Sequence, residues 1–204
     1  MHIIVEKDWS IEKIQELADK QKPDYIFFPF YSHKIPRELY DNYKCVVFHM
    51  TDLPFGRGGS PLQNLIVYGH KETKLSAIIV NSVYDGGKVW SNKPSIDLGG
   101  TAREIYARTR VLIDSMVDDI LNGKGEFDEQ RGSEREFKRR TPEQSNLSSM
   151  CNLPACYDHI RMLDADGYPN AFLRSEGLRF EFTNANLKVD CLTADVRITY
   201  DRRK

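Results

Sequence analysis

A histidine and an aspartate, each close to the end of an apolar run, are the side chains in this sequence best suited to chemistry. His49 lies in the run 45–50 (CVVFHM) and precedes the glycine-rich loop 51–60. Because its imidazole changes charge near neutral pH, it can exchange a proton with a reacting amine. Judged by position alone, a histidine satisfied by hydrogen bonds in the core is the favoured interpretation.

Asp85 follows the apolar run 74–83 and precedes Gly86 and Gly87, which let the chain turn sharply or approach a ligand closely. Taken alone, it is best explained as a simple Asp-Gly turn. Taken with His49, it indicates a catalytic pair, because a carboxylate beside an imidazole can orient the ring or stabilise its charged form. The pair is therefore the candidate reaction centre if the two segments are neighbours in one sheet.

The first third of the chain alternates apolar runs with helical patterns. Strands are predicted at 2–6, 24–30 and 45–50, with a helix capped by Ser10 and a short helix from Pro36 to Tyr43 between them. This order predicts a parallel sheet wrapped by crossovers. Ligands of such sheets bind beyond the carboxyl ends of the strands, where His49 lies.

The later part of the chain predicts one long helix and a small β region. Thr101 and Glu104 form a capping box ahead of an apolar stripe that ends at Asn122 and Gly123. A charged stretch follows and is interpreted as a surface linker. The remaining predicted elements are a helix at 61–68, extended segments at 74–83 and 88–97, the linker at 123–146, a short helix at 157–163, and antiparallel strands at 178–182, 187–191 and 196–200.

The sequence thus predicts an α/β chain with a Rossmann-like, mostly parallel sheet core and a small C-terminal antiparallel β region. We expect a core at residues 1–124 and a linker with a β-rich region at 125–204. The 29 basic and 30 acidic side chains give a formal net charge of -1, which argues against nucleic acid as a partner. No apolar run approaches the roughly 20 residues that cross a bilayer, and the start does not read as a secretory signal, so a cytoplasmic protein without a membrane partner is expected.

The cysteines are scattered and predict no metal site. Cys45 opens an apolar run, Cys151 and Cys156 flank a turn, and Cys191 stands apart, with no C-x-x-C pair and no histidine at zinc-finger spacing. Free thiols in a reducing compartment are the better interpretation.

Several spaced motifs resemble the folate-dependent formyltransferases. Residues 49–58 (HMTDLPFGRG) resemble that family's H-x-S-x-L-P-x-x-R-G signature, and Pro61-Leu62-Gln63 matches its P-[IL]-Q stretch. Asp85-Gly86-Gly87 resembles the D-x-G loop, and residues 33–39 resemble the segment before the histidine strand. The resemblance covers residues 24–120 well and 138–182 loosely, and is closest to short amino-sugar N-formyltransferases.

This resemblance implies a formyltransferase fold, N10-formyltetrahydrofolate as co-substrate and no metal. It implies that His49 stabilises the oxyanion or moves the amine proton, while Asp85 keeps His49 charged and relays the proton. Arg57 either contacts the second substrate or braces its loop. The pterin of the folate is expected against His33, Lys34, Ile35, Val83, Tyr84 and Asp85, and the second substrate against Thr51, Arg57 and Gly58.

Two departures from the family pattern stand out. Val47 occupies the position at which the family has an asparagine that holds the formyl oxygen, and Asn64 or Asn81 are the nearest replacements by sequence. Losing such a donor costs about two to three orders of magnitude in rate elsewhere, so a substitute is expected. The segment before the pterin-binding region is also short.

The preferred acceptor amine is a nucleotide-linked 4-amino-4,6-dideoxysugar of the pseudaminic type, used in surface glycans. The balanced charge and aromatic residues able to stack on a base or sugar favour it. The alternatives are methionyl-tRNA, a formylation module like those of peptide synthetases, and, from another class, a non-catalytic folate- or nucleotide-binding protein. The apolar strands of the tail leave a homodimer open.

Overall fold

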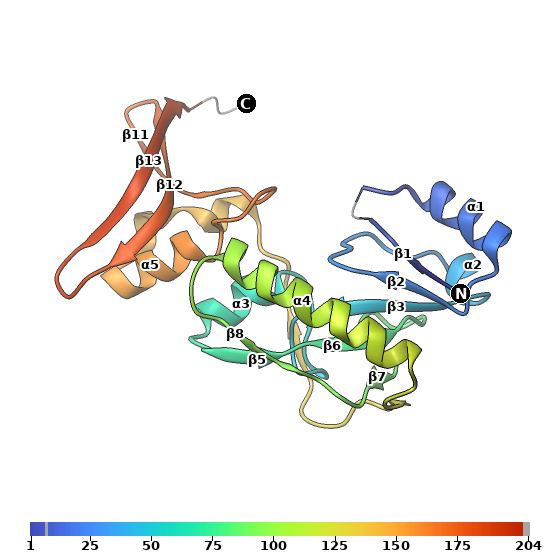
Figure 1. The fold of residues 1–204 in the computed structure, drawn as a ribbon. Helices are drawn as coiled ribbons and strands as arrows, with labels where there is room; N and C mark the ends of the chain where they lie inside the picture. Colours follow the sequence, from blue (N-terminus) through green and yellow to red (C-terminus); the bar gives the residue numbers. More distant parts are fainter. Residues whose placement is uncertain (7, 202–204) are drawn as a thin grey trace. The chain divides into compact units, whose positions relative to one another are not determined.

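A computed structural model describes residues 1–6 and 8–201 of the chain (Figure 1). The chain forms two compact units, and both are discontinuous in sequence. The first contains residues 1–61, 73–96 and 108–137, and the second contains 62–72, 97–107 and the residues from 138 onward. The two units are interleaved along the chain, so this division does not test the single boundary expected near residue 124. That boundary stays a prediction.

The main sheet of the first unit begins with three parallel strands, β1 (His2–Ile4), β2 (Tyr25–Phe28) and β3 (Lys44–His49). Helices α1 (Ile11–Gln21) and α2 (Arg37–Tyr40) connect them, and Ser10 caps α1 by accepting from the Lys13 amide. Buried Ile14 and Leu39 pack with Ile26 and Cys45. The predicted strand–helix alternation and its parallel pairing are confirmed.

The sheet continues with antiparallel strands, in the order β1-β2-β3-β6-β7-β9. Figure 1 labels the first five of these strands. The added strands are β6 (Ser76–Ile79), β7 (Val89–Trp90) and β9 (Phe127–Asp128). β6 pairs with β3 so that His49 lies opposite Ser76. The end of β3 therefore meets the beginning of β6, and the predicted α/β class is confirmed.

The stretch predicted as a surface linker is largely exposed, and it also contributes strands to two sheets. Besides β9, it contains β10 (Arg135–Phe137), which pairs in parallel with β4 (Phe55–Gly58) inside the glycine-rich loop. The ring of Phe137 is buried and lies edge-on to that of Phe55, with centroids 5.5 Å apart. Together with Phe127 of β9, whose ring lies 5.0 Å from that of Trp90, this aromatic contact anchors the charged segment. A small two-stranded sheet joins β5 (Glu72–Lys74) to β8 (Ser95–Asp97).

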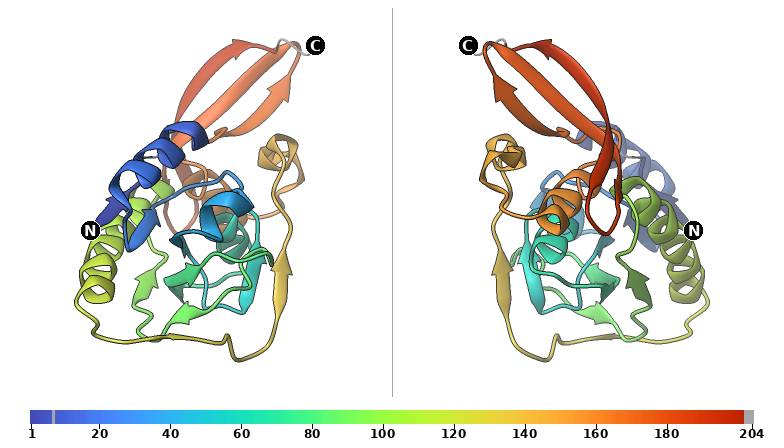
Figure 2. Two further views of the ribbon diagram at one scale, coloured as in Figure 1. Left: turned by 90° about the vertical axis from the view of Figure 1, so that its right-hand side faces the viewer. Right: turned by 90° about the vertical axis from the view of Figure 1, so that its left-hand side faces the viewer.

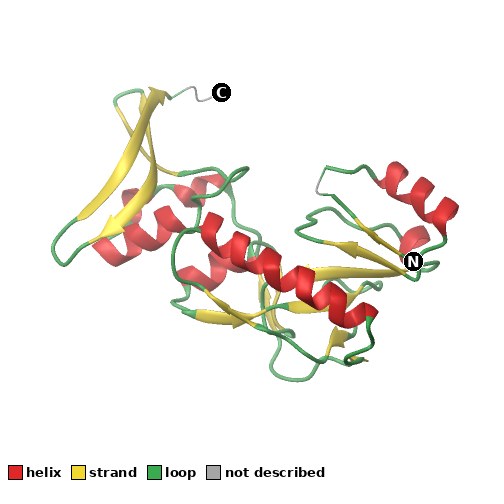
Figure 3. Ribbon diagram, viewed as in Figure 1, coloured by secondary structure: helices red, strands yellow, loops and turns green. Residues whose placement is uncertain are grey.

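Two helices begin at the motifs that predicted them; helices are drawn red in Figure 3. Helix α3 spans Pro61–Val67, and α4 spans Ala102–Leu121. The capping box is confirmed, because Thr101 N donates to Glu104 Oε2 at 2.8 Å and Glu104 N donates to Thr101 Oγ1 at 3.3 Å. No helix in the described part of the chain is long and apolar enough to cross a membrane.

The second unit ends in a three-stranded antiparallel sheet (Figure 2). Its elements after α4 are η1 (Pro142–Ser145), η2 (Leu147–Ser149), α5 (Leu153–Arg161), β11 (Ala171–Ser175), β12 (Leu178–Leu187) and β13 (Leu192–Tyr200). The predicted antiparallel region is confirmed, but the strand expected at 187–191 is wrong. There Lys188 N donates to Cys191 O, which closes the turn between β12 and β13.

Candidate functional site

His49 lies at the carboxyl end of β3 with its side chain 10% exposed. Its Nε2 atom is 2.8 Å from the carbonyl oxygen of Gly56 in β4. Since a carbonyl only accepts, Nε2 carries the proton in this contact. The strand thus fixes the ring, and the loop after it fixes the tautomer.

Asp85 faces the other ring nitrogen. Its Oδ2 lies 3.7 Å from Nδ1 of His49, and its side chain is 11% exposed. This distance is too long for a hydrogen bond but short enough for an ion pair once His49 is protonated. The same oxygen accepts the amide of Gly58 at 2.9 Å. The structure therefore brings together the two side chains that the sequence singled out, while their catalytic roles stay predictions.

Two glycines near this pair, Gly58 and Gly87, lie so close to other backbone atoms that neither position has room for a side chain. Gly58 has φ +106°, and a Cβ there would collide with the carbonyl oxygen of Phe137 in β10. A Cβ on Gly87 would collide with the carbonyl oxygen of Ile79, at the end of β6. Asp85 itself adopts the left-handed conformation, with φ +51°. The turn after β6 is thus held close to the sheet.

Arg57 is held by side chains from the segment after α4. Its Nε and Nη2 atoms donate to Oε1 of Gln130 at 3.1 and 2.7 Å, and Nη1 donates to Oε1 of Glu134 at 3.1 Å. Of the two roles considered for Arg57, this geometry matches bracing of the loop. Contact with the second substrate stays a prediction. Gln130 was missed by sequence reasoning, because one glutamine in a charged stretch carries no motif.

Thr51, expected at the second substrate, is fully buried beneath the loop. Its Oγ1 donates to the Gly56 carbonyl at 3.4 Å, and its own carbonyl accepts from Ser76 Oγ at 2.7 Å. These contacts join β6 to the loop that follows His49. A substrate contact by Thr51 stays a prediction, as does one by Gly58.

An ion-pair cluster fixes the start of the same loop. Asp52 pairs with Lys93, and with Lys74 at 3.2 Å. Partial burial acts to raise the pKa of Asp52, but the hydrogen bonds and charges of the lysines outweigh it, so the pKa lies below its usual value. Asp52 is therefore charged at neutral pH.

The segments expected to hold the pterin lie in the same unit. Ile35 is buried in the core cluster against which Val80 also packs, whereas His33 and Lys34 are exposed. Val83 and Tyr84, next to the partly buried Asp85, are 55% and 62% exposed. An exposed apolar surface next to the candidate centre is compatible with a flat aromatic ring, and the contact itself stays a prediction.

The two asparagines considered as replacements for the family asparagine each bond to a backbone group elsewhere. Val47 is partly buried and packs against two core clusters. Asn81 is exposed, and its Oδ1 accepts the Val83 amide at 2.9 Å within a turn. Asn64 belongs to the second unit, where its Nδ2 donates to the Lys138 carbonyl at 3.0 Å.

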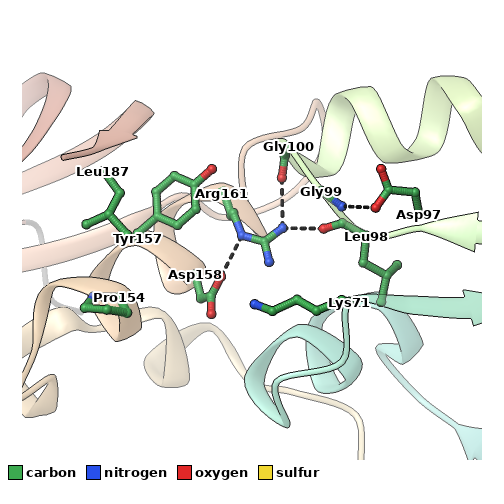
Figure 4. Close-up of a pocket in the computed structure, with 10 residues that line it drawn as sticks. All are labelled: Lys71, Asp97, Leu98, Gly99, Gly100, Pro154, Tyr157, Asp158, Arg161 and Leu187. Atoms are coloured by element: carbon green, nitrogen blue, oxygen red, sulfur yellow. Dashed lines mark hydrogen bonds and ion pairs between the residues drawn. The ribbon is translucent and has the colours of Figure 1, made fainter. Parts of the chain in front are cut away.

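A separate cavity of about 260 Å³ lies in the second unit (Figure 4). The side chain of Arg161, 5% exposed, lies along it and pairs with Asp158 at 2.6 Å. Arg161 Nη1 donates to the carbonyls of Leu98 and Gly100 at 2.6 and 2.9 Å, which ties α5 to the loop before α4. None of the predicted site residues lines this cavity. In the described part of the chain, no group of three or more His, Cys, Asp or Glu side chains could hold a metal ion.

The comparisons with known proteins find similarity to methionyl-tRNA formyltransferases. A family model described as "Methionyl-tRNA formyltransferase, C-terminal domain" matches residues 142–199. The solved structure of methionyl-tRNA formyltransferase from Clostridium thermocellum is 41% identical, with a TM-score of 0.86, covering 98% of this chain and 99% of that one. Among curated methionyl-tRNA formyltransferases, that of Finegoldia magna is 24% identical, covering 66% of this chain and 44% of that protein. That of Wolbachia pipientis subsp. Culex pipiens is 24% identical, covering 88% of this chain and 59% of that protein, so the chain spans only part of the length of these relatives.

More distant structures share the fold. HypX from Aquifex aeolicus in complex with tetrahydrofolic acid is 19% identical with a TM-score of 0.71, covering 87% of this chain and 32% of that one. A sugar N-formyltransferase from Shewanella sp. is 16% identical with a TM-score of 0.67, covering 89% of this chain and 78% of that one.

Proposed function

Because the chain belongs to the formyltransferase family, we propose that it transfers a formyl group from N10-formyltetrahydrofolate to the amine of methionyl-tRNA. The 41% identity to a methionyl-tRNA formyltransferase along nearly the whole chain supports this acceptor. The match of residues 142–199 to the C-terminal domain of such enzymes supports it independently. The nucleotide-linked amino sugar preferred from the sequence alone becomes the second candidate.

The observation that carries formyl transfer is the approach of Asp85 Oδ2 to within 3.7 Å of His49 Nδ1, with both side chains about nine-tenths shielded from solvent. In the reaction, the amine nitrogen bonds to the formyl carbon, the bond from that carbon to N10 of the folate breaks, and the amine proton passes to N10. A tetrahedral intermediate with a negative oxygen lies between these steps. A cationic imidazole beside a carboxylate suits both the charge and the proton transfer.

The contacts of His49 assign its two nitrogens different tasks. Nε2 is engaged with the Gly56 carbonyl, so we assign the proton exchange to Nδ1, which faces Asp85. The carboxylate stabilises the protonated ring, and partial exclusion of water strengthens that interaction. Asp85 is in turn held by the Gly58 amide. Positioning of two bound reactants supplies a further large part of the rate.

The first unit offers surfaces that suit a formylated folate. The exposed side chains of Val83 and Tyr84 lie next to Asp85 in sequence and can contact a flat pterin. The exposed residues His33 and Lys34 add polar groups from the segment leading to α2. We therefore propose that the pterin lies against residues 33–35 and 83–85.

The amino-sugar acceptor keeps one observation in its favour. The formal net charge of -1 gives no overall attraction to a long polyanion. A small nucleotide-linked amine does not depend on such attraction. The net charge does not describe local basic patches, so it is a weaker argument about the acceptor than the 41% sequence identity.

A single assay separates the candidates. The purified protein is mixed with N10-formyltetrahydrofolate and with methionyl-tRNA, a nucleotide-linked 4-amino-4,6-dideoxysugar, or no acceptor, and tetrahydrofolate release is followed. Release that depends on methionyl-tRNA supports the proposal, whereas release with the sugar alone replaces it by the second candidate. Tight folate binding without release under any condition contradicts both and favours a non-catalytic folate-binding protein.

A further inference from the structure

Gln130 uses its whole side-chain amide to connect the two loops of the candidate centre. Its Nε2 atom donates to the carbonyls of Asp85 and Gly87, at 2.7 and 2.8 Å. Its Oε1 atom accepts from Nε and Nη2 of Arg57. A glutamine amide has two donor hydrogens and two acceptor lone pairs, so all of its hydrogen-bonding capacity is used within this one cluster.

These bonds act on the backbone that carries the Asp85 carboxylate. Asp85 holds a left-handed conformation, which is costly for a residue with a Cβ and persists only where its surroundings fix it. Gln130 fixes the carbonyl of that residue and the one two positions later. On the other side it fixes Arg57, directly before Gly58, whose amide donates to Asp85 Oδ2. The carboxylate is thus fixed through its own backbone and through its hydrogen-bond donor.

We propose that Gln130 is a positioning residue for catalysis, which sets the distance between the Asp85 carboxylate and the His49 imidazole. The catalytic meaning of this statement rests on the proposed function, whereas the placement of Asp85 can be tested without any substrate. Gln130 itself does not contact His49 through any interaction described for this chain. It acts through Asp85, Arg57 and Gly58.

Two variants separate the donor and acceptor halves of the amide. Gln130→Met keeps a similar shape and removes every hydrogen bond. Gln130→Glu retains acceptors for Arg57 but replaces the donor by a carboxylate oxygen facing two carbonyls. Both should release the turn at Asp85. The control is the neighbouring Glu129→Gln. The Glu129 side chain is exposed and forms a long ion pair, with its Oε1 3.7 Å from Nζ of Lys88.

The readout independent of activity is hydrogen exchange at two neighbouring amides. Gly58 N–H donates to Asp85 Oδ2, and Gly59 N–H donates to the Phe137 carbonyl at 2.9 Å. We expect both Gln130 variants to speed exchange at Gly58 at least tenfold while Gly59 stays within about twofold, since only Gly58 reports on Asp85. Unchanged exchange at Gly58 in both variants would overturn the proposal, as would equal acceleration at Gly58 and Gly59.

Kinetics supply the second readout. We expect kcat to fall roughly 10- to 100-fold in both variants with KM for either substrate within about threefold, because small displacements at a reaction centre cost rates of this size. A loss confined to KM would show that Gln130 shapes a binding surface instead, which contradicts the proposal. If the native protein transfers no formyl group to any acceptor, the proposed function fails, and the Gly58 exchange still decides whether Gln130 places Asp85.

Discussion

Oδ2 of Asp85 accepts the amide of Gly58 and lies 3.7 Å from Nδ1 of His49. One carboxylate oxygen thus links the turn after β6 to the end of β4, while facing the histidine at the end of β3. His49 contacts β4 as well, through the Gly56 carbonyl. The imidazole, the carboxylate and β4 therefore contact one another in all three pairings.

Removing either member of the pair should stop turnover while the fold persists. We expect His49→Ala and Asp85→Ala to lower kcat roughly 10²- to 10⁴-fold, the range attributed to a positioned proton-transfer group. Formyl transfer is measured with the acceptor identified by the assay above, and circular dichroism reports on folding. Turnover equal to that of the native protein in either variant would remove the assignment of that residue.

Gly58 should tolerate no side chain. Gly58→Ala combines a φ of +106° with a collision against the Phe137 carbonyl, so we expect it to destabilise the fold by about 2–4 kcal/mol. Gly123→Ala, in the same unit, has φ +64° with nothing within 4 Å of the added Cβ, so it isolates the conformational strain of about 1–2 kcal/mol. Urea unfolding measures both, and equal losses would show that the collision is relieved by movement of β10.

The Asp52 cluster should make stability depend on acid. The pKa of Asp52 is lowered in the folded protein, so the charged carboxylate binds the two lysines more favourably than the protonated form does. This contribution is complete above the unfolded pKa of about 3.9 and is lost as the pH falls through the lower folded pKa. Asp52→Asn should therefore reduce stability at pH 7 and flatten its decline below about pH 4, as measured by urea unfolding. An unchanged pH dependence would contradict the assignment.

Cys45 should be inert to alkylation in the folded protein. Burial raises the pKa of its thiol to about 12, so the reactive thiolate is almost absent at pH 8. Cys151 and Cys191 are exposed and serve as internal controls. Mass spectrometry after iodoacetamide treatment should find both exposed thiols modified and Cys45 unmodified until urea is added. Equal labelling of Cys45 without urea would show that β3 opens readily.

Arg161 should be a principal stabilising residue of the second unit. Arg161→Met removes a buried guanidinium bound to Asp158 and to two carbonyls, and breaking such a pair costs about 3–5 kcal/mol. The control is Arg103→Met, in the same unit, whose pair with Asp166 is exposed and should contribute little. Thermal unfolding compares them, and similar losses would mean that burial of the Arg161 pair adds nothing.

Local signals in the sequence determined a large part of this structure. The alternation of apolar runs with helical patterns predicted the parallel strands β1, β2 and β3 and the helices between them. The cap at Ser10 and the capping box of Thr101 and Glu104 were predicted because each depends on residues three positions apart. His49 and Asp85 were found because they carry titratable groups, the first at the end of an apolar strand and the second just after one. Interactions of this kind are encoded in short windows, where residue type and spacing suffice.

The contacts between distant segments were decided only by the tertiary structure. Gln130 lies 45 residues from Asp85 and 73 from Arg57, so no local pattern could connect them. Sequence reasoning also missed the pairing of β10 with β4, because a short strand exists only where a partner strand completes its hydrogen bonds. It likewise missed the turn at 188–191, where a strand was expected. The sequence by itself named the imidazole and the carboxylate. The tertiary structure alone decided how closely their segments approach and which glutamine connects them, because these contacts join residues that are distant in sequence.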